Sequence, residues 1–159
     1  TVAGYAASMF YIIVYSIMSL GAFGMIILLS RAGFEADRLD DFKGLSTKSP
    51  WSAFLVLVLM LSMAGVPPLL GFWAKWSVLQ EVIGAGYVWL AVVALLLSVI
   101  GLFYYLRVIK LVYFDEPVDD GEVQAAGDVK VALSANSLAI LVLGLFPGGL
   151  LAACFAAMG

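Results

Sequence analysis

Apolar residues gather in four long runs along the chain, and each run predicts helix within a membrane. The first run, Tyr5 to Ser30, carries no charged side chain over 26 positions. A helix needs about 20 residues to cross the hydrocarbon core of a bilayer, so this run can span one. The other runs cover residues 51–83, 87–113 and 131–157, and the polar loops cover residues 31–49 and 114–130. Pro147 predicts a kink in the last of these runs.

The second run is too long for one straight helix. Its 33 residues would form a helix of about 49 Å, whereas the hydrocarbon core is about 30 Å thick. A glycine-proline segment from Gly65 to Gly71, with Pro67 and Pro68 inside it, interrupts the run. The pieces on either side have 14 and 12 residues and are each too short to cross. We therefore expect one crossing made of two half-helices that meet inside the membrane.

Lysine and arginine residues are distributed unequally between the two predicted faces of the membrane. With four crossings, the two polar loops share a face and have seven Lys and Arg residues in or next to them. The opposite face, with residues 84–86 and both chain ends, has none. Such an excess of Lys and Arg is typical of cytoplasmic loops. If the broken run were counted as two crossings, one face would have four of these residues and the other three. We predict four spanning helices, cytoplasmic loops at 31–49 and 114–130, and both ends outside.

The composition excludes several classes of protein. Hydrophobic residues make up 64% of the chain and charged residues 12%, against about 45–50% and about 25% in soluble domains. This balance excludes a soluble enzyme and a disordered chain. The chain has no histidine and a single cysteine, Cys154, which excludes an internal disulfide, a His-based metal site and a Ser-His nucleophile. The net charge of −3, without a basic tract, argues against nucleic-acid binding. The fold class that remains is an all-α integral membrane protein.

The first residues suggest that the chain is a piece of a longer protein. Thr1 is not a methionine, and the apolar run follows almost at once, without the charged start or cleavage site of a signal peptide. We expect a C-terminal portion of a larger chain. A truncated or processed chain would look the same.

Lys75 is the strongest functional candidate, because it lies just after the break with apolar neighbours on both sides. A lysine at membrane depth costs about 2.5–3.5 kcal/mol, so it indicates a function by default. Lysine can take up and release a proton, whereas arginine stays charged. We predict a proton relay at Lys75. The alternatives are a side chain that reaches toward an interface and a permanent salt bridge.

Glu81 is the second charged residue away from the loops. It lies six residues after Lys75, about 240° around a helix, so the two side chains are not expected to face each other. Its position near the outer end of the run favours a solvated interfacial carboxylate. The functional alternative is an exit-side proton acceptor.

The break and the lysine resemble those of the antiporter-like subunits of respiratory complex I, the proton-pumping NADH:quinone oxidoreductase. The resemblance rests on the segment Ala64-Gly65-Val66-Pro67-Pro68-Leu69-Leu70-Gly71-Phe72-Trp73-Ala74-Lys75-Trp76. Residues 20–24 and 103–108 resemble the helices before and after this break. The chain matches the last four of the family's fourteen transmembrane helices, and an aromatic residue after the lysine, here Trp76, is similar to the subunit N type.

This resemblance implies that Lys75 is the terminal lysine of a proton path near the outer exit. The family's other essential pair, a glutamate and a lysine on earlier helices, lies outside this chain. The resemblance also implies a subunit without redox chemistry of its own, since NADH, FMN, iron–sulfur clusters and quinone bind in other subunits.

The implied partners are the other membrane subunits of complex I and the lipid bilayer. The implied location is the inner membrane of a bacterial cell, with the mitochondrial inner membrane as the alternative. Two other functions stay open. One is a subunit of a multisubunit cation/proton antiporter, which shares these helices, and the other is a structural membrane scaffold.

Overall fold

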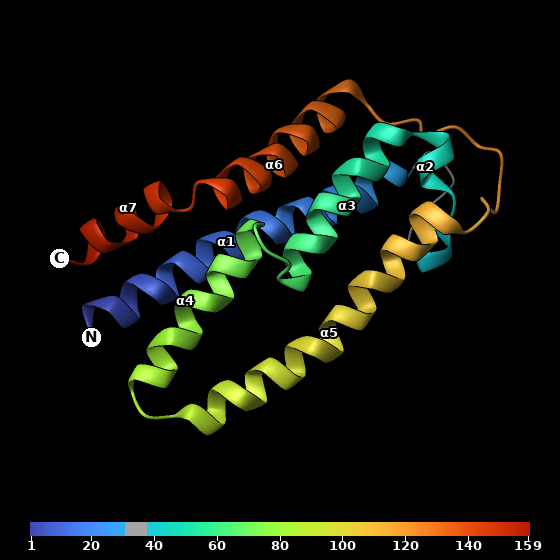
Figure 1. Cartoon of the computed structure of the whole chain (residues 1–159). Helices are drawn as coiled ribbons and strands as arrows, with labels where there is room; N and C mark the ends of the chain where they lie inside the picture. The colour runs from blue at the N-terminus through green and yellow to red at the C-terminus, as the bar shows by residue number, and fades with distance from the viewer. Residues whose placement is uncertain (31–37) are drawn as a thin grey trace.

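The computed structural model describes residues 1–30 and 38–159, and these residues form helices joined by loops, with no strand among them (Figure 1). Arg31, Glu35 and Asp37, which belong to the first predicted loop, lie outside the described residues. The elements are α1 (Val2–Leu29), the short helices η1 (Leu39–Phe42) and α2 (Leu45–Lys48), α3 (Pro50–Ala64), α4 (Leu70–Gly84), α5 (Val88–Phe114), α6 (Gly127–Leu145) and α7 (Gly148–Met158).

Three of the described helices are long and apolar enough to cross a membrane, namely α1, α5 and α6. α3 and α4 have 15 residues each, which gives each a length of about 22 Å, less than the thickness of a hydrocarbon core. They occupy the second apolar run, with residues 65–69 between them. The last run is also divided, because α6 ends at Leu145 and α7 begins at Gly148. Pro147 lies at this junction, where it can donate no backbone hydrogen bond.

The core surrounds α1, which contacts α3, α4, α6 and α7. The side chains that fill it are nearly inaccessible to solvent and come mostly from α1, α3, α4 and α6, among them Phe10, Val14, Leu59, Leu70 and Ile140. α5 packs on the outside of this group against α3 and α4 and buries only Ala91, Leu111 and Val112.

The connections between helices lie at opposite ends of the molecule. Figure 1 shows α2 and the connection from α5 to α6 at one end, and both chain termini with the turn between α4 and α5 at the other. The two polar loops are joined by an ion pair between Lys48 and Asp119, whose charged atoms are 2.6 Å apart. The Gly44 amide also donates a hydrogen bond to the carbonyl of Leu111. The described polar residues of the two loops therefore lie together at one end of the molecule, called the polar end below.

Candidate functional site

The end of α3 is determined by a backbone turn at Gly65. This residue has φ of 84° and ψ of 32°, a left-handed conformation that side chains disfavour. Its amide donates to the carbonyls of Leu61 and Ser62, and the amide of Val66 donates to Leu61 as well. The chain then passes through Pro67 and Pro68, which are joined by a cis bond, before α4 begins at Leu70.

Gly71 and Ser62 hold the start of α4 against the end of α3. The Gly71 amide donates to Ser62 Oγ at 3.0 Å, and Ser62 is fully buried. A Cβ atom at Gly71 would lie 1.9 Å from the Ser62 carbonyl oxygen, so only glycine allows this approach of the two backbones. The Ser62 hydroxyl in turn lies 3.3 Å from the Met18 sulfur on α1. Ser62 therefore connects α1, α3 and α4.

Lys75 reaches back from α4 to the C-terminal end of α3. Its Nζ atom donates to the carbonyl of Met63 at 3.1 Å and lies 3.4 Å from that of Ala64. The last carbonyls of a helix lack partners within the helix and carry partial negative charge. Since α3 ends here, these carbonyls have no amide partner within the helix, and the Lys75 side chain supplies a donor to them.

Lys75, which the sequence places at membrane depth, is not fully enclosed in the part of the chain that the structure describes. Lys75 is half-buried, and the fully buried polar side chains among the described residues are all serines. The reason is that two cavities border Lys75, so its side chain is not enclosed by packed atoms.

The two cavities beside Lys75 differ in their linings. One, of about 300 Å³, lies between α4 and α5 and is lined almost entirely by apolar side chains, among them Phe72 and Trp76. The other, of about 290 Å³, lies between α1, α4 and α5. Its lining includes the hydroxyl-bearing residues Tyr11, Tyr15, Ser98 and Tyr105. A cavity of this size has room for water, for which these hydroxyl groups offer hydrogen-bond partners.

Glu81 lies at the other end of α4, beside the start of α1. It borders a cavity of about 440 Å³ together with Thr1, Ser8 and Tyr87. Among the described residues, no ion pair joins Glu81 or Lys75 to an oppositely charged side chain. The structure therefore does not bring the two predicted site residues together.

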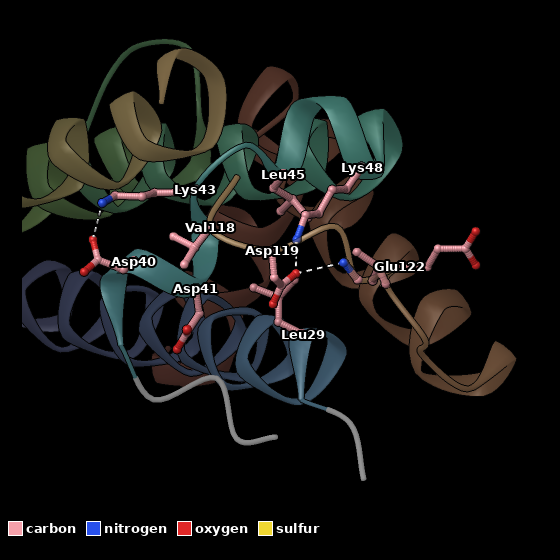
Figure 2. Close-up of a pocket in the computed structure, with 11 residues that line it drawn as sticks. Leu29, Asp40, Asp41, Lys43, Leu45, Lys48, Val118, Asp119 and Glu122 are labelled. Atoms are coloured by element: carbon pink, nitrogen blue, oxygen red, sulfur yellow. Dashed lines mark hydrogen bonds and ion pairs between the residues drawn. The ribbon is translucent and has the colours of Figure 1, made fainter. Parts of the chain in front are cut away.

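The polar end has its own small cavity of about 80 Å³ (Figure 2). Figure 2 shows Lys48 directed at Asp119 and Lys43 directed at Asp40. The hydrogen bond from Lys43 holds the pKa of Asp40 below its ordinary value, and the same bond raises the pKa of Lys43. In the described part of the chain, no three His, Cys, Asp or Glu side chains are grouped to bind a metal ion. This cavity is therefore lined by charged side chains that pair with one another at the surface.

Comparisons with known proteins agree with the resemblance noted above. Residues 1–101 match the model of the NADH:quinone oxidoreductase/Mrp antiporter transmembrane family. Two curated relatives are NADH-quinone oxidoreductase subunit N of Thiobacillus denitrificans, 58% identical over 98% of this chain and 32% of the relative, and that of Herminiimonas arsenicoxydans, 60% identical over 99% and 32%.

The structural comparison gives the same picture. The fold matches a chain of respiratory complex I from Thermus thermophilus, solved with bound aureothin, with a TM-score of 0.81 and 32% identity. The match covers 92% of this chain and 34% of that one. The chain thus spans about a third of the length of the proteins it matches.

Proposed function

The chain belongs to the NADH:quinone oxidoreductase/Mrp antiporter transmembrane family, and we propose that it is the C-terminal part of an N-type, proton-translocating subunit of NADH:quinone oxidoreductase. The relatives that share 58% and 60% of its residues bear the subunit N name. Lys75 is the residue that relays protons in this proposal.

The proposed topology has four crossings, the second made of α3 and α4 and the fourth of α6 and α7. Each pair together supplies the length that neither helix has alone. Residues 31–49 and 114–130 lie in the cytoplasm and both ends lie outside. The position of α2 and the α5–α6 connection at the same end supports a shared face for the two loops.

The relay proposal rests on one observation, the position of the Lys75 ammonium between the last carbonyls of α3 and a cavity bordered by several hydroxyl groups. Water in this cavity would deliver or accept the proton, and the Met63 and Ala64 carbonyls would stabilise the charged form between transfers. Glu81, six residues further along α4, lies about 9 Å toward the outer end. It would accept the proton on the exit side through bridging water.

The remaining parts of the proposal concern the whole complex. The partners of this chain are other membrane subunits of complex I and the surrounding lipid, in the plasma membrane of a bacterium, as its bacterial relatives suggest. NADH, FMN, iron–sulfur clusters and quinone belong to other subunits. Electron transfer there would drive proton movement here.

The test compares Lys75→Ala and Lys75→Arg in the full-length subunit within its complex, at equal assembled amounts. Both variants are expected to lower proton uptake into vesicles and NADH-driven quinone reduction about tenfold or more, the rate effect of about 1.4 kcal/mol. Arginine keeps the charge but cannot release a proton, so it separates a relay from a structural cation. Lys110→Ala is the matched control, because it removes an exposed lysine at the cytoplasmic end of α5. The Nζ atom of Lys110 lies 3.6 Å from the Asp115 carboxylate.

Full pumping by the arginine variant would overturn the relay. Sodium-dependent proton exchange without NADH-driven activity would instead identify a cation/proton antiporter, which the same family model includes. Unchanged activity in both Lys75 variants would leave a structural scaffold.

A further inference from the structure

The two helix interruptions of the chain are packed against each other. α6 ends at Leu145, and the residue before it, Gly144, lies against the first residues of α4. A Cβ atom at Gly144 would lie 2.6 Å from the Leu70 nitrogen and 2.9 Å from the Leu69 carbonyl carbon. The backbone of one interruption thus touches the backbone of the other, and no side chain separates them.

The carbonyl of Gly144 finds its hydrogen bond across this contact. In a continuous helix it would accept from the amide four residues later, but the chain turns at Phe146 and Pro147 before α7 begins. The indole of Trp73 donates to this carbonyl instead, with a distance of 2.8 Å between Nε1 and the oxygen. An unpaired carbonyl at membrane depth costs several kcal/mol, so this bond gives the indole a definite position.

Trp73 lies on α4 two residues before Lys75. α4 is therefore held at its start from two directions, by Ser62 of α3 through Gly71 and by Gly144 of α6 through Trp73. The reach of Lys75 Nζ to the α3 carbonyls depends on where α4 lies along α3. A contact that prevents α4 from sliding also determines where the ammonium lies.

We propose that Trp73 is a positioning residue for Lys75, acting through its bond to the Gly144 carbonyl exposed by the α6–α7 interruption. This inference rests on the proposed relay at Lys75 and deepens it. The α6–α7 pair then has a part in proton transfer although, among its described residues, it brings no charged side chain to Lys75.

The test contrasts Trp73→Phe with Trp73→His in the full-length subunit within its complex. Phenylalanine keeps most of the apolar bulk and loses the donor. Histidine loses bulk, but its Nε2–H stands at the same place on the five-membered ring as the indole N–H. A purely structural role predicts that phenylalanine performs better in both assembly and rate. The positioning role predicts that histidine, per assembled complex, retains more proton uptake than phenylalanine.

We expect Trp73→Phe to lower proton uptake per assembled complex about threefold to tenfold, the range set by one lost hydrogen bond. Added to Lys75→Ala, it should cause no further loss, because its effect acts through Lys75. Trp51→Phe is the matched control, since the Trp51 indole donates to Ser134 Oγ at 2.9 Å, also linking to α6 but at the loop end. This variant should keep the wild-type rate per complex.

Three results would overturn the inference. The first is a wild-type rate in Trp73→Phe while Lys75→Ala is impaired, which would leave the relay itself intact. The second is additional loss when Trp73→Phe is combined with Lys75→Ala. The third is a lower rate per complex for histidine than for phenylalanine. Wild-type activity in Lys75→Ala would instead refute the proposed function, and the positioning role with it.

Discussion

The contact between Gly71 and Ser62 predicts a large loss of stability in Gly71→Ala. The new Cβ atom would lie 1.9 Å from the Ser62 carbonyl oxygen and 2.8 Å from the carbonyl carbon, whereas nonbonded atoms need about 3.5 Å. These are backbone atoms, which cannot rotate away as the end of a side chain can. α4 would have to move from α3 by roughly 1.5 Å.

Two costs follow from this movement. Forcing an extra methyl group into packed structure costs about 1–3 kcal/mol. The shift would also stretch the bond from the Gly71 amide to Ser62 Oγ, now 3.0 Å, and a buried donor without a partner costs about 1–3 kcal/mol. The sum, about 2–6 kcal/mol, is a large part of the stability of an ordinary domain, at about 5–15 kcal/mol.

The measurement is the half-life of the full-length variant subunit in membranes after protein synthesis is stopped, together with the thermal midpoint of the purified complex. Both should fall sharply. Gly84→Ala is the control on the same helix, because a Cβ atom there meets no atom within 4 Å and alanine is the better helix former. If Gly71→Ala assembles and melts like the wild type, the two backbones are not in contact as described and the reasoning fails.

Two further predictions concern the break and the polar end. Gly65→Ala should destabilise the subunit by about 1–2 kcal/mol, because alanine disfavours the φ of 84° at this position. It should also lower proton uptake per assembled complex, because the new Cβ atom would lie 3.3 Å from Lys75 Nζ. An unchanged thermal midpoint and an unchanged rate would contradict this prediction. Lys48→Ala and Asp119→Ala should show a coupling energy of about 0.5–1 kcal/mol in a double-mutant cycle of thermal stability. Added salt should reduce this coupling energy, because it screens the two charges. Strictly additive effects would contradict the ion pair.

Much of the candidate site was predictable from local chemistry. Lys75 is conspicuous because a charged side chain amid apolar residues near a glycine-proline segment has few explanations in a membrane. Its hydrogen-bond partners were not predictable, since they are backbone carbonyls of Met63 and Ala64, which every residue possesses. Its partial exposure was not predictable either, because it depends on how far α4 and α5 lie apart. The tyrosines that line the second cavity come from α1 and α5, and only packing brings them to Lys75.

The sequence by itself determined where helix can run and where it must stop. An uncharged run that is long enough to cross a bilayer indicates a membrane helix. Gly65 can adopt backbone conformations that other residues disfavour, and Pro147 cannot donate a backbone hydrogen bond within a helix. These are properties of single residues or short segments, so they need no knowledge of neighbours.

Only the tertiary structure decided which surfaces meet. Membrane helices are apolar on every side, so their periodicity does not mark a packing face as it does in a soluble helix. Trp73 and Gly144 are 71 residues apart, and neither carries a charge that would select the other. Their contact exists because two interruptions leave backbone groups to be paired and glycine lets the backbones approach. The position of Lys75 depends on contacts of this kind, between groups that look alike in any sequence until folding brings them together.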